Sequence, residues 1–226
     1  MNRILALRAK RRTLVRAVEF VFCVATLTRI VAAQAIDPEA RHYWNSVFSD
    51  SKASFNRDPS RLLVEAIQDR KPGLALDLGM GQGRNAIFLA QQGWRTTGVD
   101  ISDVAVEQAQ ARARQLRVNL DTVIDSADNF DLGRNRWDLI ALFYMHAWYR
   151  GAKPGSVQRL YEGLKPGGLL VIEGFAGEPK FMFQTNELLR DFARLRILRY
   201  EDLQGEADWA PGRKSRIVKF VGEKTP

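Results

Sequence analysis

The sequence predicts an α/β fold in which helices cover both faces of a largely parallel sheet. Short apolar runs alternate with amphipathic segments through most of the chain, which is typical of repeated βαβ units. Three glycines at alternate positions follow the first apolar run, and an acidic residue ends the second. With 226 residues, of which 46% are hydrophobic, the chain is long enough to bury one full domain core.

The first βαβ unit lies in residues 74–100. Leucines at alternate positions of residues 74–78 indicate a buried strand. An amphipathic helix is expected over residues 85–92, and a second strand over residues 96–99. Because this unit joins two strands through a helix, the strands are expected to run parallel.

The turn of this unit has the composition of a ligand site. Gly79, Gly81 and Gly83 follow the strand, and a ligand lying across the strand end would touch backbone that a Cβ would hold off. Asp100 ends the second strand, where ribose hydroxyls bind in open parallel sheets. The sequence therefore indicates a nucleotide-type site.

Four motifs stand in the order of a known superfamily. Residues 77–83, Asp-Leu-Gly-Met-Gly-Gln-Gly, match the pattern D-x-G-x-G-x-G, and Asp100 is the acid of the second strand. Residues 137–140, Trp-Asp-Leu-Ile, fit a fourth strand, and residues 164–168, Leu-Lys-Pro-Gly-Gly, the turn before a fifth. Over roughly residues 40–222 the chain resembles the class I S-adenosylmethionine-dependent methyltransferases. The run Gly83-Arg84-Asn85 is most similar to their tellurite-resistance and thiopurine methyltransferase branch.

The resemblance implies a Rossmann-like sheet of seven strands in the order 3-2-1-4-5-7-6, with the last strand antiparallel. It implies S-adenosyl-L-methionine as the cofactor, and the carboxylate of Asp77 suits the cationic amino and sulfonium groups of that molecule. Asp125 is expected to contact the adenine amino group, with Asp128 as the alternative. The cofactor-binding residues expected in all are Asp77, Gly79, Gly81, Gly83, Asp100, Ile101 and Asp125.

Two other functions compete with methyl transfer. A nicotinamide dinucleotide site would carry G-x-G-x-x-G, but position 84 is arginine, so the third glycine of that pattern is missing. The second alternative is a protein that binds the methyl donor without transferring the methyl group. Nothing in the glycine motif separates that function from an enzyme.

The segment after the fourth strand is the expected acceptor site, because it leaves the carboxyl end of a central strand. It reads Phe-Tyr-Met-His over residues 143–146 in place of the [N/D]-P-P-[Y/F] tetrad of many base-methylating enzymes, which disfavours that activity. The single cysteine, Cys23, lies outside the expected domain, which argues against arsenite methylation. A small apolar or aromatic acceptor is expected, with a thiol, a hydroxyl, a metalloid or a similar group as the methylated centre, and no metal site.

His146 is the expected base for a hydroxyl or thiol acceptor, and Tyr144 the expected hydrogen-bond donor. Structural hydrogen bonding for His146 and packing for Tyr144 stay open as alternatives. Phe175, Phe181 and Phe183 are expected either to line the acceptor pocket or to belong to the core.

The other elements follow from periodicity and from cap residues. Ser60 is expected to cap a helix through about Arg70, and Ser102 to cap a helix over residues 103–115. A lid is expected in residues 36–70, with Trp44 and Phe55 as its candidate residues. The alternative is that they pack the helix onto the sheet, which is favoured for Trp44 and left open for Phe55. The remaining expectations are strands over residues 120–124, 139–143 and 169–173, helices over residues 157–163 and 185–193, and two closing strands over residues 195–200 and 216–221 joined by a polar loop.

Residues 1–35 form an expected leader ahead of a single domain over residues 36–226. Seven basic residues against Glu19 give this leader +6 of the net charge of +8, so the domain is nearly neutral and no nucleic-acid partner is expected. Ala33-Gln34-Ala35 fits the cleavage site of a signal, but Glu19 and Arg29 do not fit one. Export, weak membrane contact and a cytoplasmic location, where the methyl donor is made, all stay open. The sequence predicts no oligomeric state.

Overall fold

The computed structural model describes residues 36–226 apart from residues 53–54, 153–154 and 209. The chain divides into two units, and the described residues all belong to the second, Ala33–Pro226. The expected leader of residues 1–35 lies outside the described residues. No helix in the described ranges is both long and apolar enough to cross a membrane.

Seven strands form one sheet in the order β3-β2-β1-β4-β5-β7-β6, which confirms the predicted fold. The neighbours from β3 to β5 pair in parallel, whereas β7 is antiparallel to both β5 and β6. The strands are β1 Leu74–Leu78, β2 Arg95–Asp100, β3 Asp121–Ile124, β4 Trp137–Phe143, β5 Leu164–Phe175, β6 Arg196–Ala207 and β7 Ala210–Glu223.

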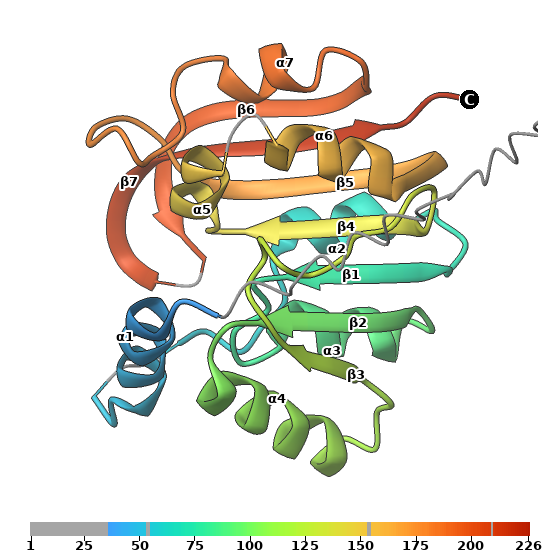
Figure 1. The fold of residues 1–226 in the computed structure, drawn as a ribbon. Coiled ribbons are helices and arrows are strands. Elements are labelled where there is room, and N and C mark those ends of the chain that lie inside the picture. Colours follow the sequence, from blue (N-terminus) through green and yellow to red (C-terminus); the bar gives the residue numbers. More distant parts are fainter. Residues whose placement is uncertain (1–35, 53–54, 153–154, 209) are drawn as a thin grey trace, which may run out of the picture. The chain divides into compact units, whose positions relative to one another are not determined.

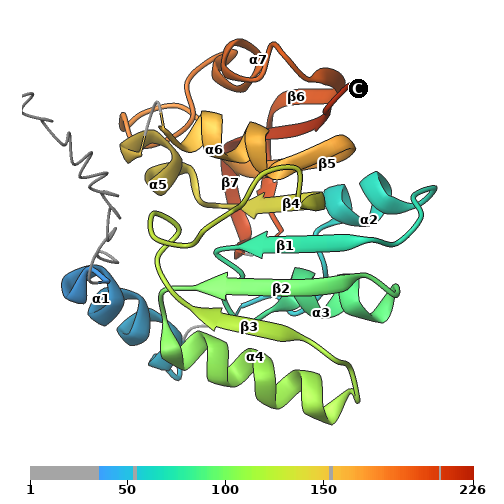
Figure 2. The ribbon, with the colours of Figure 1, turned by 45° about the vertical axis from the view of Figure 1, so that its right-hand side comes forward.

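Helices cover both faces of this sheet (Figures 1 and 2). One core cluster joins β1, β4 and β5 to α2 and α3, and a second joins the opposite face to α5, α6 and α7. The helices are α1 Pro38–Ser49, α2 Arg61–Ile67, α3 Arg84–Gln91, α4 Asp103–Gln115, α5 His146–Gly151, α6 Gly155–Gly163 and α7 Glu187–Asp191.

Strand β4 contributes buried side chains to the cores on both faces of the sheet. Its side chains alternate across the sheet, so Leu139 and Ala141 join the cluster of α2 and α3, whereas Ile140 and Leu142 join the other. All four are buried. A strand with an unbroken apolar run is what a central parallel position requires.

The parallel strands all end at one edge of the sheet. In Figure 1 the arrowheads of β1, β2 and β4 point to the same side, where α1, α5 and the turn between β6 and β7 also lie. The loops that leave these strand ends include the glycine motif and the segment after β4. Ligand sites form at this edge in open α/β sheets.

The closing strands are much longer than the sequence predicted. Strands β6 and β7 stay paired from Arg196↔Glu223 to Ala207↔Ala210, so the residues expected in a polar loop are strands. The ladder is reinforced across the two strands by Arg216, whose guanidinium donates to both carboxylate oxygens of Asp202. These residues lack an apolar alternation because the hairpin continues past the body of the sheet (Figure 1).

Three further boundaries differ from the expectation. The motif of residues 164–168 belongs to β5, where a register shift and a positive φ of 81° at Gly167 replace the expected turn. Helix α2 ends at Ile67, and the Ser60 hydroxyl makes no capping hydrogen bond. Helix α7 has only five residues. Helix α4, in contrast, spans residues 103–115 with Ser102 as its cap, as predicted.

Candidate functional site

A cavity of about 1150 Å³ lies at the carboxyl edge of the sheet. Its walls come from the glycine motif, the loop after β3, the segment after β4 and the chain before α2. Ligand pockets commonly measure about 300 to 1,000 Å³. The cavity therefore has room for more than one small ligand.

Asp77, one residue before the end of β1, lines this cavity and has a carboxylate oxygen without a partner among the described residues. The side chain is 1% exposed, and its Oδ2 atom makes no hydrogen bond within the described residues. Burial raises the pKa of Asp77 to about 7, although Arg84 nearby opposes the shift. A buried, unsatisfied carboxylate that lines a cavity is suited to a cationic ligand group such as an ammonium.

Asp100 is held at the end of β2 by backbone amides. The N–H of Gly81 donates to its Oδ2 over 2.8 Å, and the N–H of Ser102 donates to its Oδ1 over 2.9 Å. Burial nevertheless raises the pKa of this carboxyl. Asp100 and Ile101 both line the cavity, beside the glycine motif.

Two of the three glycines, Gly79 and Gly83, are needed for different reasons. Gly79 lines the cavity with a φ of 77°, and a Cβ there would lie 2.3 Å from the sulfur of Met145. Gly83 has the same φ, but it does not line the cavity, and its Cβ would lie 2.9 Å from that of Ala109. The expected ligand contact at Gly83 is therefore replaced by close packing of α3 on α4.

The loop after β3 presents Asp128 rather than Asp125 to the cavity. Asp128 lines the cavity, and its Oδ1 accepts a hydrogen bond of 2.9 Å from the indole of Trp148. Asp125 is absent from the lining, and its carboxylate accepts from the N–H of Ser126. Of the two residues considered for the adenine contact, the geometry favours Asp128.

The chain before α2 supplies one wall of the cavity. Trp44 and Phe48 of α1 stack with their ring centroids 6.0 Å apart, and Phe48 also contacts Phe55. All three line the cavity. Trp44 is 38% exposed and α1 has no buried residue, so the favoured expectation that Trp44 packs a helix onto the sheet is wrong.

The wall after β4 is aromatic. Tyr144 and His146 line the cavity, and the ring of Phe175 lies 5.1 Å from the first and 5.5 Å from the second. Phe181 stacks on His146 and also lines the cavity, whereas Phe183 is 1% exposed and belongs to the core. Two of the three phenylalanines considered for the pocket are thus in it.

His146 is a weak base in this environment. Burial lowers its pKa to about 4, and its Nδ1 has no hydrogen-bond partner in the described part of the chain. A histidine that acts as a base at neutral pH is usually oriented by an acceptor at its other ring nitrogen. The ring of His146 is positioned by aromatic packing instead.

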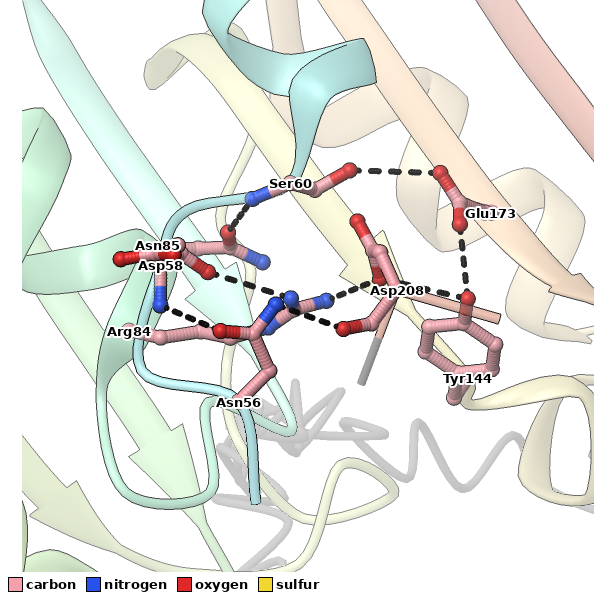
Figure 3. A network of polar contacts seen from close by, with 8 residues as sticks. All are labelled: Asn56, Asp58, Ser60, Arg84, Asn85, Tyr144, Glu173 and Asp208. Atoms are coloured by element: carbon pink, nitrogen blue, oxygen red, sulfur yellow. Dashed lines mark hydrogen bonds and ion pairs between the residues drawn. The ribbon is translucent and has the colours of Figure 1, made fainter. Parts of the chain in front are cut away.

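A polar network lies beside the cavity and joins the hairpin to the glycine motif (Figure 3). Asp208, in the turn between β6 and β7, accepts from Arg84 over 2.7 Å and from the Tyr144 hydroxyl over 3.3 Å. The Tyr144 hydroxyl also donates to Oε1 of Glu173 over 2.7 Å. Asn56 donates to the backbone oxygen of Asp208 over 2.7 Å.

The sequence analysis assigned no role to Glu173, Asp208 or the Arg84 side chain. One signal was present, because Glu173 is a lone acid at the end of an apolar run. The position of Asp208 had no local signal, since its partner Arg84 is 124 residues away. Among the described residues no group of three or more acidic, histidine or cysteine side chains is arranged to hold a metal ion.

A family model of a methyltransferase domain matches residues 75–168. "Hemagglutinin 1" of Eikenella corrodens is 30% identical over 172 residues, which cover 70% of this chain and 55% of that protein. "Probable S-adenosyl-L-methionine-dependent methyltransferase TehB" of Haemophilus influenzae is 23% identical over 168 residues, which cover 70% and 59%. The chain spans little more than half the length of these two curated relatives.

The solved structure of TehB from Haemophilus influenzae superposes with a TM-score of 0.63 at 22% identity, covering 72% of this chain and 61% of that one. A Burkholderia thailandensis 1,6-didemethyltoxoflavin-N1-methyltransferase superposes with a TM-score of 0.60 at 18% identity, covering 83% and 85%. At these identities the structures show a shared fold.

The family model, the relatives and the strand order agree with the glycine motif and the acids at the ends of β1 and β2. Residues 75–168 carry a methyltransferase domain, and the fold is that of the class I S-adenosylmethionine-dependent methyltransferases, TehB among them.

Proposed function

We propose that this protein is an enzyme that transfers the methyl group of S-adenosylmethionine to a small-molecule acceptor. The observation that carries the proposal is the single cavity, which runs from Asp77 and Asp100 to the aromatic wall around His146. Its volume of about 1150 Å³ accommodates a cofactor and an acceptor together. A protein that only binds the cofactor has no need of the part of the cavity at the aromatic wall.

The residues at the glycine motif fit the cofactor. Asp77, with its unpartnered buried oxygen, would hold the ammonium group, and Asp100 with Ile101 would hold the ribose. The backbone at Gly79 and Gly81 would lie against the methionine portion. Gly83 would act indirectly by letting α3 pack closely on α4.

The adenine amino group would meet the loop after β3. Asp128 is the residue that we propose for this contact, because it faces the cavity and the Trp148 indole holds its carboxylate. Asp125 remains the alternative from the sequence pattern.

The bound cofactor supplies the methyl group as an electrophile and departs with the electron pair of the broken carbon–sulfur bond. The protein then has to align the acceptor and exclude water. Tyr144 and His146 are the polar side chains that we propose to contact the acceptor, within a wall of Phe175 and Phe181. An aromatic wall of this kind favours an apolar or aromatic acceptor that carries a thiol or hydroxyl group.

Cofactor binding is the first test. Titration calorimetry of the full chain with S-adenosylmethionine, S-adenosylhomocysteine and NADH is expected to give saturable binding of the first two alone. Binding of NADH without binding of S-adenosylmethionine would sink the proposal.

Turnover is the second test. Tritiated methyl donor is supplied with a panel of thiols, phenols, halides, tellurite and small carboxylates, and label is expected in a thiol or a phenol. Tight cofactor binding with no labelled product from any class would favour the catalytically silent binder instead.

A further inference from the structure

The proposed reaction needs a residue that takes the proton of a hydroxyl or thiol acceptor. His146 is poorly suited, because burial lowers its pKa to about 4 and no acceptor orients its Nδ1 within the described residues. General bases work best when their pKa lies near the operating pH. A second group beside the cavity fits the task better.

Tyr144 is tied to Glu173 at both of its polar ends. Its hydroxyl donates to Oε1 of Glu173 over 2.7 Å, and its backbone N–H donates to the carbonyl of the same residue over 2.7 Å. Tyr144 adopts a φ of 57°, which is a strained backbone conformation for a tyrosine. The two hydrogen bonds to Glu173 occur together with this conformation. Because Tyr144 lines the cavity, these hydrogen bonds connect a residue of the cavity wall to a buried carboxylate.

Glu173 is buried, with 2% of its surface exposed, and charged or polar groups from four elements surround it. Ser60, just before α2, donates to Oε2 over 3.2 Å, and Lys219 of β7 favours the ionised form. Asp208 of the hairpin turn opposes ionisation, although Arg84 pairs with Asp208. Burial first and Asp208 second raise the pKa of Glu173 above its ordinary value.

We propose, on the basis of the proposed function, that Tyr144 is the catalytic residue that receives the acceptor's proton and that Glu173 is the final proton acceptor behind it. The O–H or S–H bond of the acceptor breaks, and its proton goes to the oxygen of Tyr144. The phenolic proton of Tyr144 goes to Oε1 of Glu173. The electron pair left on the acceptor atom attacks the methyl carbon.

The raised pKa of Tyr144 determines how the protons move. Burial and Glu173 raise the pKa of the Tyr144 hydroxyl, so a free phenolate is unfavourable and the two protons move together. In the proposed reaction Glu173 accepts one proton per turnover, which requires its ionised form at the start. Asp208 acts as a positioning residue, because it contacts both Arg84 and Tyr144.

Thiophenol and phenol, two acceptors of similar shape, separate a proton-transfer role from a structural one. Thiophenol is largely ionised in water at pH 8 and needs no base, whereas phenol is not ionised and needs one. Tyr144→Phe and Glu173→Gln are expected to lower kcat on phenol by about 100-fold or more. On thiophenol at pH 8 the same variants are expected to retain most of kcat.

The matched control is Glu162→Gln, which removes a glutamate on α6 that pairs with the exposed Arg134. It is expected to leave both rates unchanged. Equal losses on the two acceptors in Tyr144→Phe or Glu173→Gln would overturn the proposal and indicate a structural role.

An infrared titration without acceptor tests the link between Tyr144 and Glu173 even if the protein methylates neither probe. The carboxylic acid band that Glu173→Gln removes is expected to titrate above the ordinary pKa of a glutamate. In Tyr144→Phe its midpoint is expected to rise further, because the hydroxyl stabilises the ionised form. A midpoint at the ordinary value, or one that Tyr144→Phe does not move, would overturn the assignment. If the wild-type protein turned over neither probe, that result would count against the proposed function and would leave the infrared test of Glu173 unaffected.

Discussion

Arg84 and Asp208 form an ion pair of 2.7 Å although 124 residues separate them in the sequence. Arg84 begins the helix after the glycine motif, and Asp208 lies in the turn between β6 and β7 and also accepts from the Tyr144 hydroxyl (Figure 3). The pair therefore connects the glycine motif to the segment after β4. It is also well buried, since the Arg84 side chain is 11% exposed.

We expect Asp208→Asn to lower the free energy of unfolding by about 1 to 3 kcal/mol, because a charge-assisted hydrogen bond to a mostly buried guanidinium is lost. Urea unfolding measures this change. The control is Arg61→Ala, which removes an ion pair whose arginine is 86% exposed and which should have no measurable effect. Equal stability of Asp208→Asn and wild type would show that the hairpin is held by its strand pairing alone.

The affinity for S-adenosylmethionine is expected to depend on pH through Asp77. Its pKa of about 7 leaves the carboxyl partly protonated at neutral pH, and the cofactor's ammonium group favours the ionised form. Binding should tighten as the pH rises from 5 to 8, with release of protons to the buffer. Calorimetry in buffers of different ionisation enthalpy measures that release, and a proton count of zero at pH 6 would contradict the assignment.

Asp77→Asn should stabilise the free protein while it abolishes cofactor binding. A carboxyl whose pKa is raised in the folded state favours folding only while it is protonated, so its contribution is lost as the pH rises from about 4 to 7. Asparagine avoids this loss, which amounts to up to about 4 kcal/mol. Thermal unfolding should show a gain for the variant that grows over this pH range.

His146 should have the opposite effect on the pH dependence of stability. Its pKa is lowered to about 4 in the folded state, so the unfolded chain takes up a proton first and stability falls as the pH falls from 6.5 to 4. His146→Gln should flatten this decline, by up to about 3 kcal/mol. The Asp77→Asn background separates the two effects, and an unchanged slope there would argue against a neutral buried histidine.

Asp128→Asn is expected to weaken S-adenosylmethionine binding by about 1.5 to 3 kcal/mol, because a charge-assisted hydrogen bond to the adenine amino group is lost. Asp125→Asn is the matched control, since Asp125 is three residues away and its carboxylate caps the N–H of Ser126. Calorimetric titration compares the two. A larger loss in Asp125→Asn would restore the contact implied by the sequence pattern.

The first βαβ unit could be predicted almost to the residue because its signals are local. Apolar alternation marks β1, three glycines mark the turn and Asp100 ends β2, and none of these depends on a distant partner. The same holds for α4, where the Ser102 cap and the alanine stripe lie within the helix.

The hairpin of β6 and β7 could not be predicted in the same way. Its outer half consists of polar residues that pair only with each other, so neither hydrophobic alternation nor burial marks them as strands. The site residues Glu173 and Asp208 depend on that hairpin and on the packing of β5 beside β4. Their roles arise from tertiary contacts, for which a single sequence carries no local pattern.

Helix α1 is attached to the domain by polar contacts rather than by a core. Asp103 accepts from the side chains of Arg41 and Asn45, and Asn45 accepts in turn from Ser102. Without buried apolar area, such a helix opens at a small cost compared with global unfolding. Because its aromatic side chains line the cavity, we expect ligands to enter by local unfolding of α1, so that the observed affinity includes the free energy of folding this helix back onto the ligand.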